Sequence, residues 1–288
     1  MNKRKPPAAP RADGASGVGS GRDGRGGAVW IYGQHAVLAA LANPRRQCRR
    51  LIATPATLAT LAAAAQRVTL ERPLIEALDR RDLEKLLPPG AVHQGMALLG
   101  EPLQEPALGE VLDHLDDGVD ARLVVLDQAS DPRNVGAVIR SAAAFGAQAV
   151  VVQERHSPEA TGALAKAASG ALEFVPVIRV TNIARSLETM KQAGFWCLAL
   201  DASASRAVGE IRPASRLAIV IGAEGKGLRR LVQASCDESV RIPISNAVES
   251  LNVSVAAAVA LYQLIQLKAG PPSAHRSSGV RDFPCDER

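Results

Sequence analysis

Cysteine and aromatic residues are scarce in this chain of 288 residues. The four cysteines stand far apart, with no CxxC pair and no histidine at metal-ligand spacing: Cys48, Cys197, Cys236 and Cys285. This spacing argues against a structural zinc site and against a disulfide framework, so no metal is expected. Aromatic residues make up only 3% of the chain, which argues against recognition of a nucleic acid through bases stacked on rings.

Long apolar runs are absent as well. The longest candidates are interrupted by charged or polar residues within about a dozen positions, so no membrane-spanning segment is expected. The N-terminus carries basic residues but lacks the apolar core of a secretion signal. Its glycines and aspartates fit a disordered arm better than an organellar transit peptide. The sequence therefore predicts a cytoplasmic protein.

Positive charge is concentrated at the front of the chain. The net charge is +5, and residues 1–27 hold six Lys or Arg against two Asp. The larger C-terminal part is nearly neutral, so affinity for a nucleic acid has to come from local patches and from the front of the chain. The densest basic cluster beyond the tail is formed by Arg45, Arg46, Arg49 and Arg50. Alone, such a run is typical of a solvated rim.

The pattern of apolar residues favours two domains. After a basic, glycine-rich tail at 1–27, short strand-like and helical patterns alternate over 28–100, which predicts a small α/β domain. Residues 101–120 begin with two prolines and are predicted to be a linker. In this first domain we expect strands at 48–54 and 95–100 and helices at 34–41 and 56–67.

The second predicted domain covers residues 121–269, and a fraying tail follows at 270–288. Its strand-like segments, among them one at 240–244, are continuous apolar runs that alternate with helical patterns. Such runs are typical of a parallel sheet covered on both faces, so we expect a doubly wound α/β fold. A long helix at 251–268 is expected to close the domain.

Open α/β sheets bind ligands at the carboxyl ends of their strands, and three turns there carry polar residues. The first follows an apolar strand in LDQASDPRNVGAVIRSA (126–142), where Asp131 is expected to cap a helix with Pro132 just inside it. That helix carries Asn134 and Arg140 among small apolar residues. Polar groups in an otherwise buried pattern need partners or a ligand.

The second turn, LAIVIGAEGKGLRRL (217–231), is rich in glycine. It is not a phosphate-binding P-loop, because Lys226 is followed by glycine and the GxxxxGK spacing is absent. A tight strand-to-helix turn accounts for its glycines, with Glu224 as a first-turn acid favoured by the helix dipole. Taken alone, this structural interpretation is as good as a functional one.

The third turn lies in RIPISNAVESLNVSVAAAVAL (241–261). Taken alone, it is best explained by Ser250 as a helix cap, with Asn252 and Ser254 facing solvent. Two histidines, His35 and His93, are candidates for a catalytic role. We expect His35 at a helix start and His93 in a turn, which are structural positions. Neither has a triad partner in the sequence.

Taken together and in this order, the three stretches resemble the motifs of the SpoU branch, or TrmH family, of the SPOUT RNA ribose methyltransferases. DPRNVGAVIRSA, VIGAEGKGL, and IPI followed by ESLNVSVA occur with the expected spacing. The likeness covers most of residues 121–266, and residues 170–196 also look like the family. IYGQHAVLAAL and VHQGMAL resemble the small, L30e-like substrate-binding domain of the RlmB-type members, which modify 23S rRNA. Ile244 departs from the more frequent Met, a swap that nearly conserves volume.

The resemblance implies a fold that the apolar pattern does not propose. SPOUT domains thread the C-terminal chain through a loop as a trefoil knot, an exception to the rule that chains avoid threading. The family binds S-adenosylmethionine in this knot, largely through backbone groups. By position in the second and third motifs, the resemblance implies that these groups belong to Gly222, Ile242 and Leu251. Recognition through the backbone explains why glycine and apolar residues line an adenosine pocket of this kind.

The implied reaction is methylation of a ribose 2′-hydroxyl in RNA, with Arg140 at the position of the family's catalytic arginine. A guanidinium keeps its proton up to a pH above about 12, so its cheaper role is to hold an RNA phosphate and to stabilise the developing alkoxide. Asn134, Glu224, Ser250 and Asn252 would orient Arg140 and the ribose. The phosphate itself could then accept the proton of the hydroxyl. Glu224 is the rival base, since burial can raise the pKa of a carboxylate.

The resemblance also implies a homodimer whose sites are completed by the partner chain. Because the front domain resembles an RNA-binding domain, the four clustered arginines become candidates for contacts with RNA phosphates. The similarity of the front domain favours a guanosine of 23S rRNA as the target. Two alternatives stay open: a tRNA ribose 2′-O-methyltransferase, and a non-catalytic RNA-binding or ribosome-assembly factor on the same fold. The polar residues of the three motifs argue against the second alternative, because a scaffold does not need them.

Overall fold

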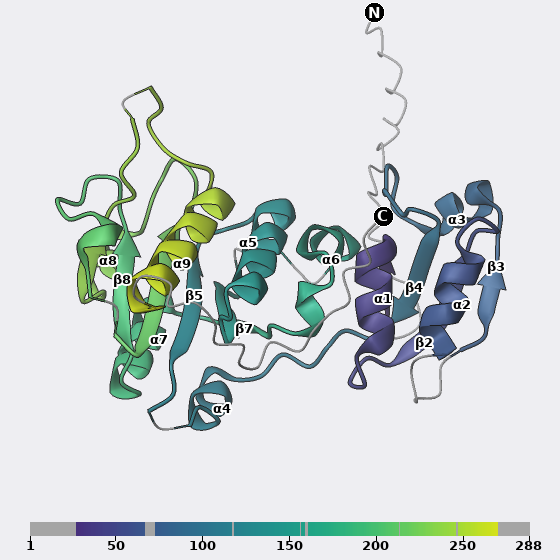
Figure 1. The fold of residues 1–288 in the computed structure, drawn as a ribbon, viewed down its shortest axis with the longest axis horizontal. Helices are drawn as coiled ribbons and strands as arrows, with labels where there is room; N and C mark the ends of the chain where they lie inside the picture. The colour runs from purple at the N-terminus through teal and green to yellow at the C-terminus, as the bar shows by residue number, and fades with distance from the viewer. Residues whose placement is uncertain are drawn as a thin grey trace, which may run out of the picture.

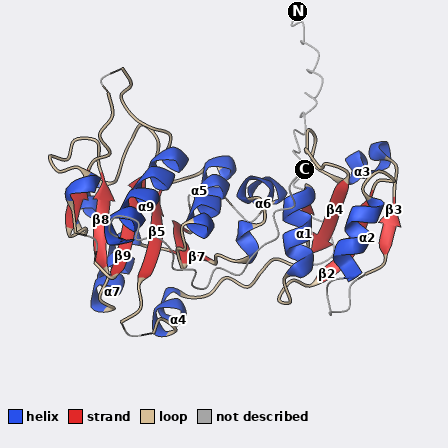
Figure 2. Cartoon of the chain, viewed as in Figure 1, coloured by secondary structure: helices blue, strands red, loops and turns tan. Residues whose placement is uncertain are grey.

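The computed structural model of the protein describes residues 27–66, 73–116, 118–155, 157–158, 161–212, 214–245 and 247–269. Within these ranges the chain forms two sheets side by side, with helix α6 (Gly162–Ala168) between them (Figure 1, Figure 2). The predicted basic tail, apart from Gly27, and the predicted C-terminal tail lie outside the described residues.

The first domain follows the predicted alternation. Its strands are β1 (Val29–Tyr32), β2 (Cys48–Ala53), β3 (Ile75–Ala77) and β4 (Met96–Gly100), and its helices are α1 (Gln34–Ala42), α2 (Leu58–Gln66) and α3 (Arg80–Leu86). The sheet order is β1-β4-β2-β3, with β4 antiparallel to both neighbours and β3 parallel to β2. All five residues of β4 are buried, which accounts for its unbroken apolar sequence. The pattern does not predict β3, because three residues give no periodic signal.

The second domain is built on the predicted parallel sheet. Its strands are β5 (Ala121–Asp127), β6 (Ala149–Gln153), β7 (Val177–Val180), β8 (Trp196–Leu200), β9 (Arg216–Gly222) and β10 (Glu238–Val240). Its further helices are α5 (Pro132–Ala144), α7 (Ile183–Gln192), α8 (Arg230–Ala234) and α9 (Val253–Ala269), with short 3-10 turns η1 (Ala171–Glu173) and η2 (Val208–Glu210). The order is β10-β8-β9-β5-β6-β7, and each of these pairings is parallel. The trefoil knot stays a prediction.

Helices cover both faces of this sheet, as the apolar runs predict. Along β5, Leu123 and Val125 belong to the cluster that contains α7, whereas Val124 and Leu126 belong to the cluster that contains α5 and α9. Successive side chains of a strand point to opposite faces, so a strand buried on both sides has to be apolar at every position. The sheet thereby holds the ends of β5 and β9 side by side.

Two predicted elements differ from the structure. The strand expected at 240–244 ends at Val240, with only a single bridge from Arg241 to Ala207 beyond it, because Pro243 cannot donate a backbone hydrogen bond to a ladder. Helix α4 (Leu108–Asp113) lies in the stretch predicted as a linker. The irregular segment between the two domains is therefore residues 101–107.

Helix α4 packs on the second domain through an apolar face. Leu108, Val111, Leu112 and Leu115 join the cluster on the α7 side of the sheet. Their spacing of three and four residues places them on one side of a helix. This spacing was the available signal for the helix, and the neighbouring prolines obscured it.

The two domains meet where α6 and η1 contact β1 and α1. Ala165 and Leu172 of the second domain join the apolar cluster of the first domain. Gly162 lies so close to β1 that a Cβ there would come within 3.0 Å of the Trp30 carbonyl oxygen. Only glycine permits this approach, because the atom in the way belongs to the backbone.

A buried ion pair joins the same two surfaces. Arg46 Nη2 lies 2.5 Å from Glu173 Oε1, and the two side chains are 6% and 3% exposed. Asn43 Nδ2 donates to the other carboxylate oxygen at 2.7 Å. A buried charge is tolerated only when it is paired and hydrogen-bonded, and both conditions are met here.

Arg46→Ala is expected to lower the free energy of unfolding by about 3–5 kcal/mol, because it leaves the Glu173 carboxylate buried without its cation. Urea denaturation monitored by circular dichroism measures the loss. The double variant Arg46→Met with Glu173→Leu is the control, since replacing both partners by apolar residues removes the uncompensated charge. A single variant as stable as the intact protein would show that the pair does not hold the domains together.

Candidate functional site

The three predicted turns meet at the side chain of Asn252. Asn252 Nδ2 donates to Asn134 Oδ1 at 3.0 Å and to Glu224 Oε2 at 3.4 Å. Asn252 Oδ1 accepts from the backbone N–H and the hydroxyl of Ser254, at 2.9 and 2.7 Å. A backbone donor therefore fixes the orientation of the amide, and both protons of Nδ2 point to the other two motifs.

Asn252 is also the residue that caps α9, a role that the sequence pattern gave to Ser250. Its carbonyl accepts from Ala256 N–H at 2.9 Å, while its side chain accepts from Ser254 N–H. Ser250 is exposed in the preceding loop. The interpretation in which Asn252 faces solvent as a weak helix former is therefore wrong.

Helix α5 presents Asn134 as predicted. Asp131 caps the helix by accepting from Arg133 N–H at 2.9 Å, and Pro132 occupies its first position. Arg140 differs from the expectation of a charge in a buried pattern, because its side chain is exposed. Six residues separate it from Asn134, so it lies about 9 Å further along the axis and on another flank. Among the described residues, it forms no hydrogen bond or ion pair.

The glycine turn after β9 is closed on itself. Ala223 and Gly227 form an isolated bridge, with Gly227 N–H donating to Ala223 O at 2.9 Å. A Cβ on Gly222 would come closer than 3.0 Å to backbone atoms of Gly227 and Leu228. Glycine is therefore required at 222 for space, and the turn projects Glu224 toward Asn252.

A cavity of about 550 Å³ lies between this turn and the loop before α9. The residues predicted to hold the cofactor, Gly222, Ile242 and Leu251, all line it, as do Glu224 and Ser250. Its size and its apolar lining with a few polar groups are typical of a pocket for a small organic ligand. Arg140 and the four clustered arginines do not line it.

Carboxylates dominate the charge around this cavity. Asp201, Glu224 and Glu249 line it, against one cation, Lys226. Asp201 Oδ1 accepts from Ser203 N–H and Oγ–H at 2.9 and 2.8 Å, and Gln233 Nε2 donates to Oδ2 at 2.6 Å. Burial opposes ionisation of Asp201, but these hydrogen bonds outweigh it and lower the pKa of the carboxyl group. The cavity therefore suits a ligand that carries positive charge.

Sequence reasoning missed a buried carboxylate that joins the first motif to the second. Asp127, the last residue of β5, is fully buried, and Arg229 Nη2 and Nε donate to its Oδ1 at 2.6 and 2.9 Å. The backbone N–H of Arg229 donates to Oδ2 at 3.0 Å. Asp127 thus holds the far end of the glycine turn. The signal in the sequence was an acid that ends an apolar strand, which needs a partner.

Asp127→Ala is expected to weaken binding of a ligand in the cavity by about tenfold and to cost about 2 kcal/mol of stability, below the range for a fully buried pair because Arg229 is partly exposed. Calorimetry with S-adenosylmethionine and urea denaturation measure the two effects. Asp79→Ala is a matched control, since Asp79 makes no side-chain cap. Unchanged binding in Asp127→Ala would show that the turn keeps its shape without this contact.

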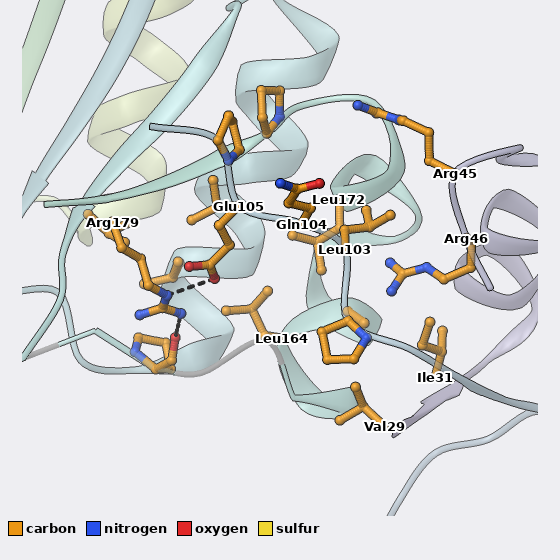
Figure 3. Close-up of a pocket in the computed structure, with 18 of the residues that line it drawn as sticks. Val29, Ile31, Arg45, Arg46, Leu103, Gln104, Glu105, Leu164, Leu172 and Arg179 are labelled. Carbon is orange, nitrogen blue, oxygen red and sulfur yellow. Dashed lines mark hydrogen bonds and ion pairs between the residues drawn. The ribbon is translucent and has the colours of Figure 1, made fainter. Parts of the chain in front are cut away.

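The clustered arginines lie apart from this cavity, and Arg45 and Arg46 lie at the junction of the domains. Arg45 and Arg46 stand at one end of a second cavity, of about 400 Å³, and Arg179 pairs with Glu105 at the other end, 2.8 Å apart (Figure 3). The pair with Glu173 gives Arg46 a structural role, so the expectation of an RNA contact does not fit this residue.

The other three arginines of the cluster differ in what they contact. Arg50 forms a bidentate pair with Glu76 at 2.8 and 2.7 Å, and Arg49 pairs with Glu101. Arg45 is exposed, and its Nη2 lies 3.4 Å from the Glu173 carbonyl oxygen. Much of the positive charge predicted as a patch is therefore neutralised within the first domain and its junction.

Other expectations concern metals, membranes and reactive side chains. Within the ranges that the structure describes, no group of three or more metal-ligating side chains occurs, and no helix is long and apolar enough to cross a bilayer. Burial raises the pKa of Cys197 and of Cys236 to about 12, so neither thiol is a nucleophile. His35 is exposed at the start of α1, and His93 is buried in the turn before β4.

A parallel α/β domain with a cavity at the carboxyl ends of its strands, joined to a smaller α/β domain, is the architecture of a two-domain protein that binds a small ligand at the edge of its sheet. The sequence model of the SpoU rRNA Methylase family matches residues 121–262. The model described as RNA 2′-O ribose methyltransferase substrate binding matches residues 30–106.

Curated relatives agree with these matches. A 23S rRNA (guanosine-2′-O-)-methyltransferase RlmB of Vibrio vulnificus is 34% identical over 238 residues, which cover 82% of this chain and 96% of that protein. An uncharacterised tRNA/rRNA methyltransferase of Synechocystis is 36% identical over 261 residues, 89% of this chain and 67% of that protein. The chain spans 59% of a longer relative from Mycolicibacterium vanbaalenii. The protein belongs to the SpoU family of RNA methyltransferases.

Solved structures share the fold. A structure described as RNA 2′-O ribose methyltransferase is 25% identical, with a TM-score of 0.67, and the match covers 83% of this chain and 88% of that one. The SpoU methyltransferase AviRb of Streptomyces viridochromogenes is 22% identical with a TM-score of 0.69, over 84% of this chain and 90% of that one. Both matches extend over the two domains.

Proposed function

We propose that the protein transfers a methyl group from S-adenosylmethionine to the ribose 2′-hydroxyl of a guanosine in 23S rRNA, in the cytoplasm. The observation that carries this proposal is the meeting of Asn134, Glu224 and Asn252 beside the cavity of the glycine turn. The choice of 23S rRNA is supported by the likeness to the Vibrio RlmB enzyme over both domains.

The residues of the cavity fit the cofactor. Gly222, Ile242 and Leu251 would hold it through backbone groups and apolar contacts, in a space closed by the glycine turn. Asp201 and Glu249 supply negative charge where a cationic ligand is expected. When bound, S-adenosylmethionine supplies an electrophilic methyl group on a sulfonium ion. A related structure from Sinorhizobium meliloti is described as AdoMet-bound.

The remaining side chains have to activate a hydroxyl, which is a poor nucleophile until its proton has a destination. Hydrogen bonds to Ser254 orient the Asn252 amide, which contacts Asn134 and Glu224 on either side. Ser250 faces the same cavity. Arg140 would hold the phosphate next to the target ribose and stabilise the developing oxyanion as a permanent cation. The phosphate held by Arg140 would accept the proton of the hydroxyl, and Glu224 is the alternative acceptor.

A homodimer accounts for the placement of Arg140. Arg140 is exposed on α5, outside the cavity of its own chain. The neighbouring helix α9 exposes Val255, Val259 and Tyr262. These residues are four and three positions apart, so they lie along one face of the helix. A second copy packed on this face would cover the apolar stripe and could bring its Arg140 to the site.

Tyr262→Glu is expected to give a monomer in sedimentation experiments, because it places a charge on the apolar face of α9.

Two measurements on the purified protein test the proposal. Calorimetry is expected to show one S-adenosylmethionine bound per chain. Transfer of a tritiated methyl group into unmethylated 23S rRNA transcript, followed by nuclease digestion, is expected to yield 2′-O-methylguanosine. A chain that binds the transcript but not the cofactor would be a non-catalytic RNA-binding factor. Transfer into tRNA alone would show that the protein is a tRNA ribose 2′-O-methyltransferase.

A further inference from the structure

A third cavity, of about 1040 Å³, lies wholly within the first domain. Its walls are the turn after β2, the start of α3 and the loop before β4, and three prolines line it: Pro55, Pro88 and Pro89. The turn and the loop are joined by Thr57, whose Oγ1 donates to Gly95 O at 2.7 Å. Proline fixes its own backbone φ angle, so these three residues lose little conformational freedom when a ligand binds.

His93 lines this cavity and is 4% exposed. Its Nδ1 accepts from Gly95 N–H at 3.1 Å, so the neutral imidazole carries its proton on Nε2. Nε2 is buried and has no hydrogen-bond partner in the described part of the chain. Glu84 Oε1 lies 3.6 Å from it, beyond hydrogen-bond distance. A buried donor without an acceptor is costly, and a ligand that accepts from it would recover this cost.

The carboxylate nearest to His93 belongs to Glu84, and it is held only by an exposed ion pair. Glu84 pairs with Arg80 at 3.0 Å, one helical turn away, and the two side chains are 51% and 79% exposed. Exposed pairs of this kind contribute little to stability, so Glu84 can turn aside when another acceptor arrives. Arg80 would then present its guanidinium at the rim of the cavity, where it can pair with a phosphate.

We propose that this cavity binds one unpaired nucleobase of the RNA substrate, with His93 Nε2–H donating to the edge of the base and Arg80 facing the adjoining phosphate. The inference rests on the proposed function. The cavity lies in the domain that matches a substrate-binding family. Its proline faces give a flat base an apolar contact that the few aromatic residues of the chain do not supply. Pairing within a helix would occupy the edge acceptors, so the site selects an unpaired base.

Two RNA hairpins of equal length test this inference with the full chain. One carries a single bulged 2-aminopurine, and the other is fully paired. The bulged hairpin is expected to bind about tenfold more tightly in fluorescence anisotropy, on the order of what one added hydrogen bond from His93 contributes. Its 2-aminopurine emission and the His93 Nε2 resonance in ¹⁵N NMR are expected to change on binding.

Variants that fill the cavity from its rim separate this site from general RNA affinity. Ala56→Trp and Val92→Trp place a ring in the cavity at exposed positions, so the core is untouched. Both are expected to reduce the preference for the bulged hairpin to less than about twofold. Ala42→Trp, an exposed alanine at the end of α1 outside the cavity, is the matched control and is expected to keep the preference.

Equal binding of the two hairpins by the intact chain, or a preference that survives both filling variants, would overturn the inference. Transfer of a methyl group into 23S rRNA transcript is measured on the same preparations. If the intact chain methylates the transcript without preferring the bulged hairpin, the nucleobase site is wrong and the proposed function stands. If it neither methylates the transcript nor binds either hairpin, both fail.

Discussion

Arg140→Ala is expected to reduce the single-turnover rate of methyl transfer by at least about a hundredfold, the loss seen when one charge-stabilising donor is removed from an active site. Stability is expected to change by less than about 0.5 kcal/mol, because an exposed side chain away from special contacts contributes little to folding. Rapid-quench measurements with tritiated cofactor give the rate, and calorimetry is expected to show unchanged affinity for S-adenosylmethionine.

Arg185→Ala serves as the control for Arg140→Ala, because Arg185 is an exposed arginine on α7, on the other side of the sheet. Its rate is expected to equal that of the intact protein. Glu224→Gln tests the rival base: it keeps the shape of the side chain and removes the carboxylate. Transfer that survives the loss of Arg140 but not the loss of the Glu224 carboxylate would reverse the assignment of roles.

Gly222→Ala is expected to abolish measurable binding of S-adenosylmethionine, a loss of at least about a hundredfold, or about 2.7 kcal/mol. The added Cβ would come within 3.0 Å of the backbone of Gly227 and Leu228. A backbone obstacle cannot rotate away as a side chain can, so the turn has to open. Calorimetry with the cofactor measures the effect directly.

The control for Gly222→Ala is Gly109→Ala, where a Cβ meets nothing within 4 Å. This variant is expected to bind the cofactor normally. Circular dichroism and urea denaturation of both variants separate a local change of the turn from loss of the fold. Normal cofactor affinity in a folded Gly222→Ala variant would show that the glycine turn does not shape the cofactor site.

Local signals gave the elements of the second domain. Asp131 and Pro132 predicted the start of α5, and the structure confirms both. Continuous apolar runs predicted a parallel sheet buried on both faces, because each face of the strand has to be covered. The sequence pattern did not predict helix α4, because its short apolar face follows directly on a segment with two prolines.

The site was harder to predict, since its geometry depends on contacts between distant residues. Sequence order grouped the three motifs, but only the fold shows that Asn252 joins Asn134 to Glu224. The ion pair of Asp127 with Arg229 spans 102 positions and leaves no local pattern. For Arg46, the local pattern was misleading. Four nearby arginines suggested a charged patch, whereas Arg46 is buried in an ion pair with Glu173, 127 positions away.

The most direct test of the proposed function is to map 2′-O-methyl groups in total RNA from a strain that lacks this protein. We expect one 2′-O-methylguanosine to be missing from 23S rRNA, to return when the intact gene is restored, and to stay missing with the Arg140→Ala variant. An unchanged 23S rRNA, or a methyl group lost from tRNA instead, would contradict the proposed function.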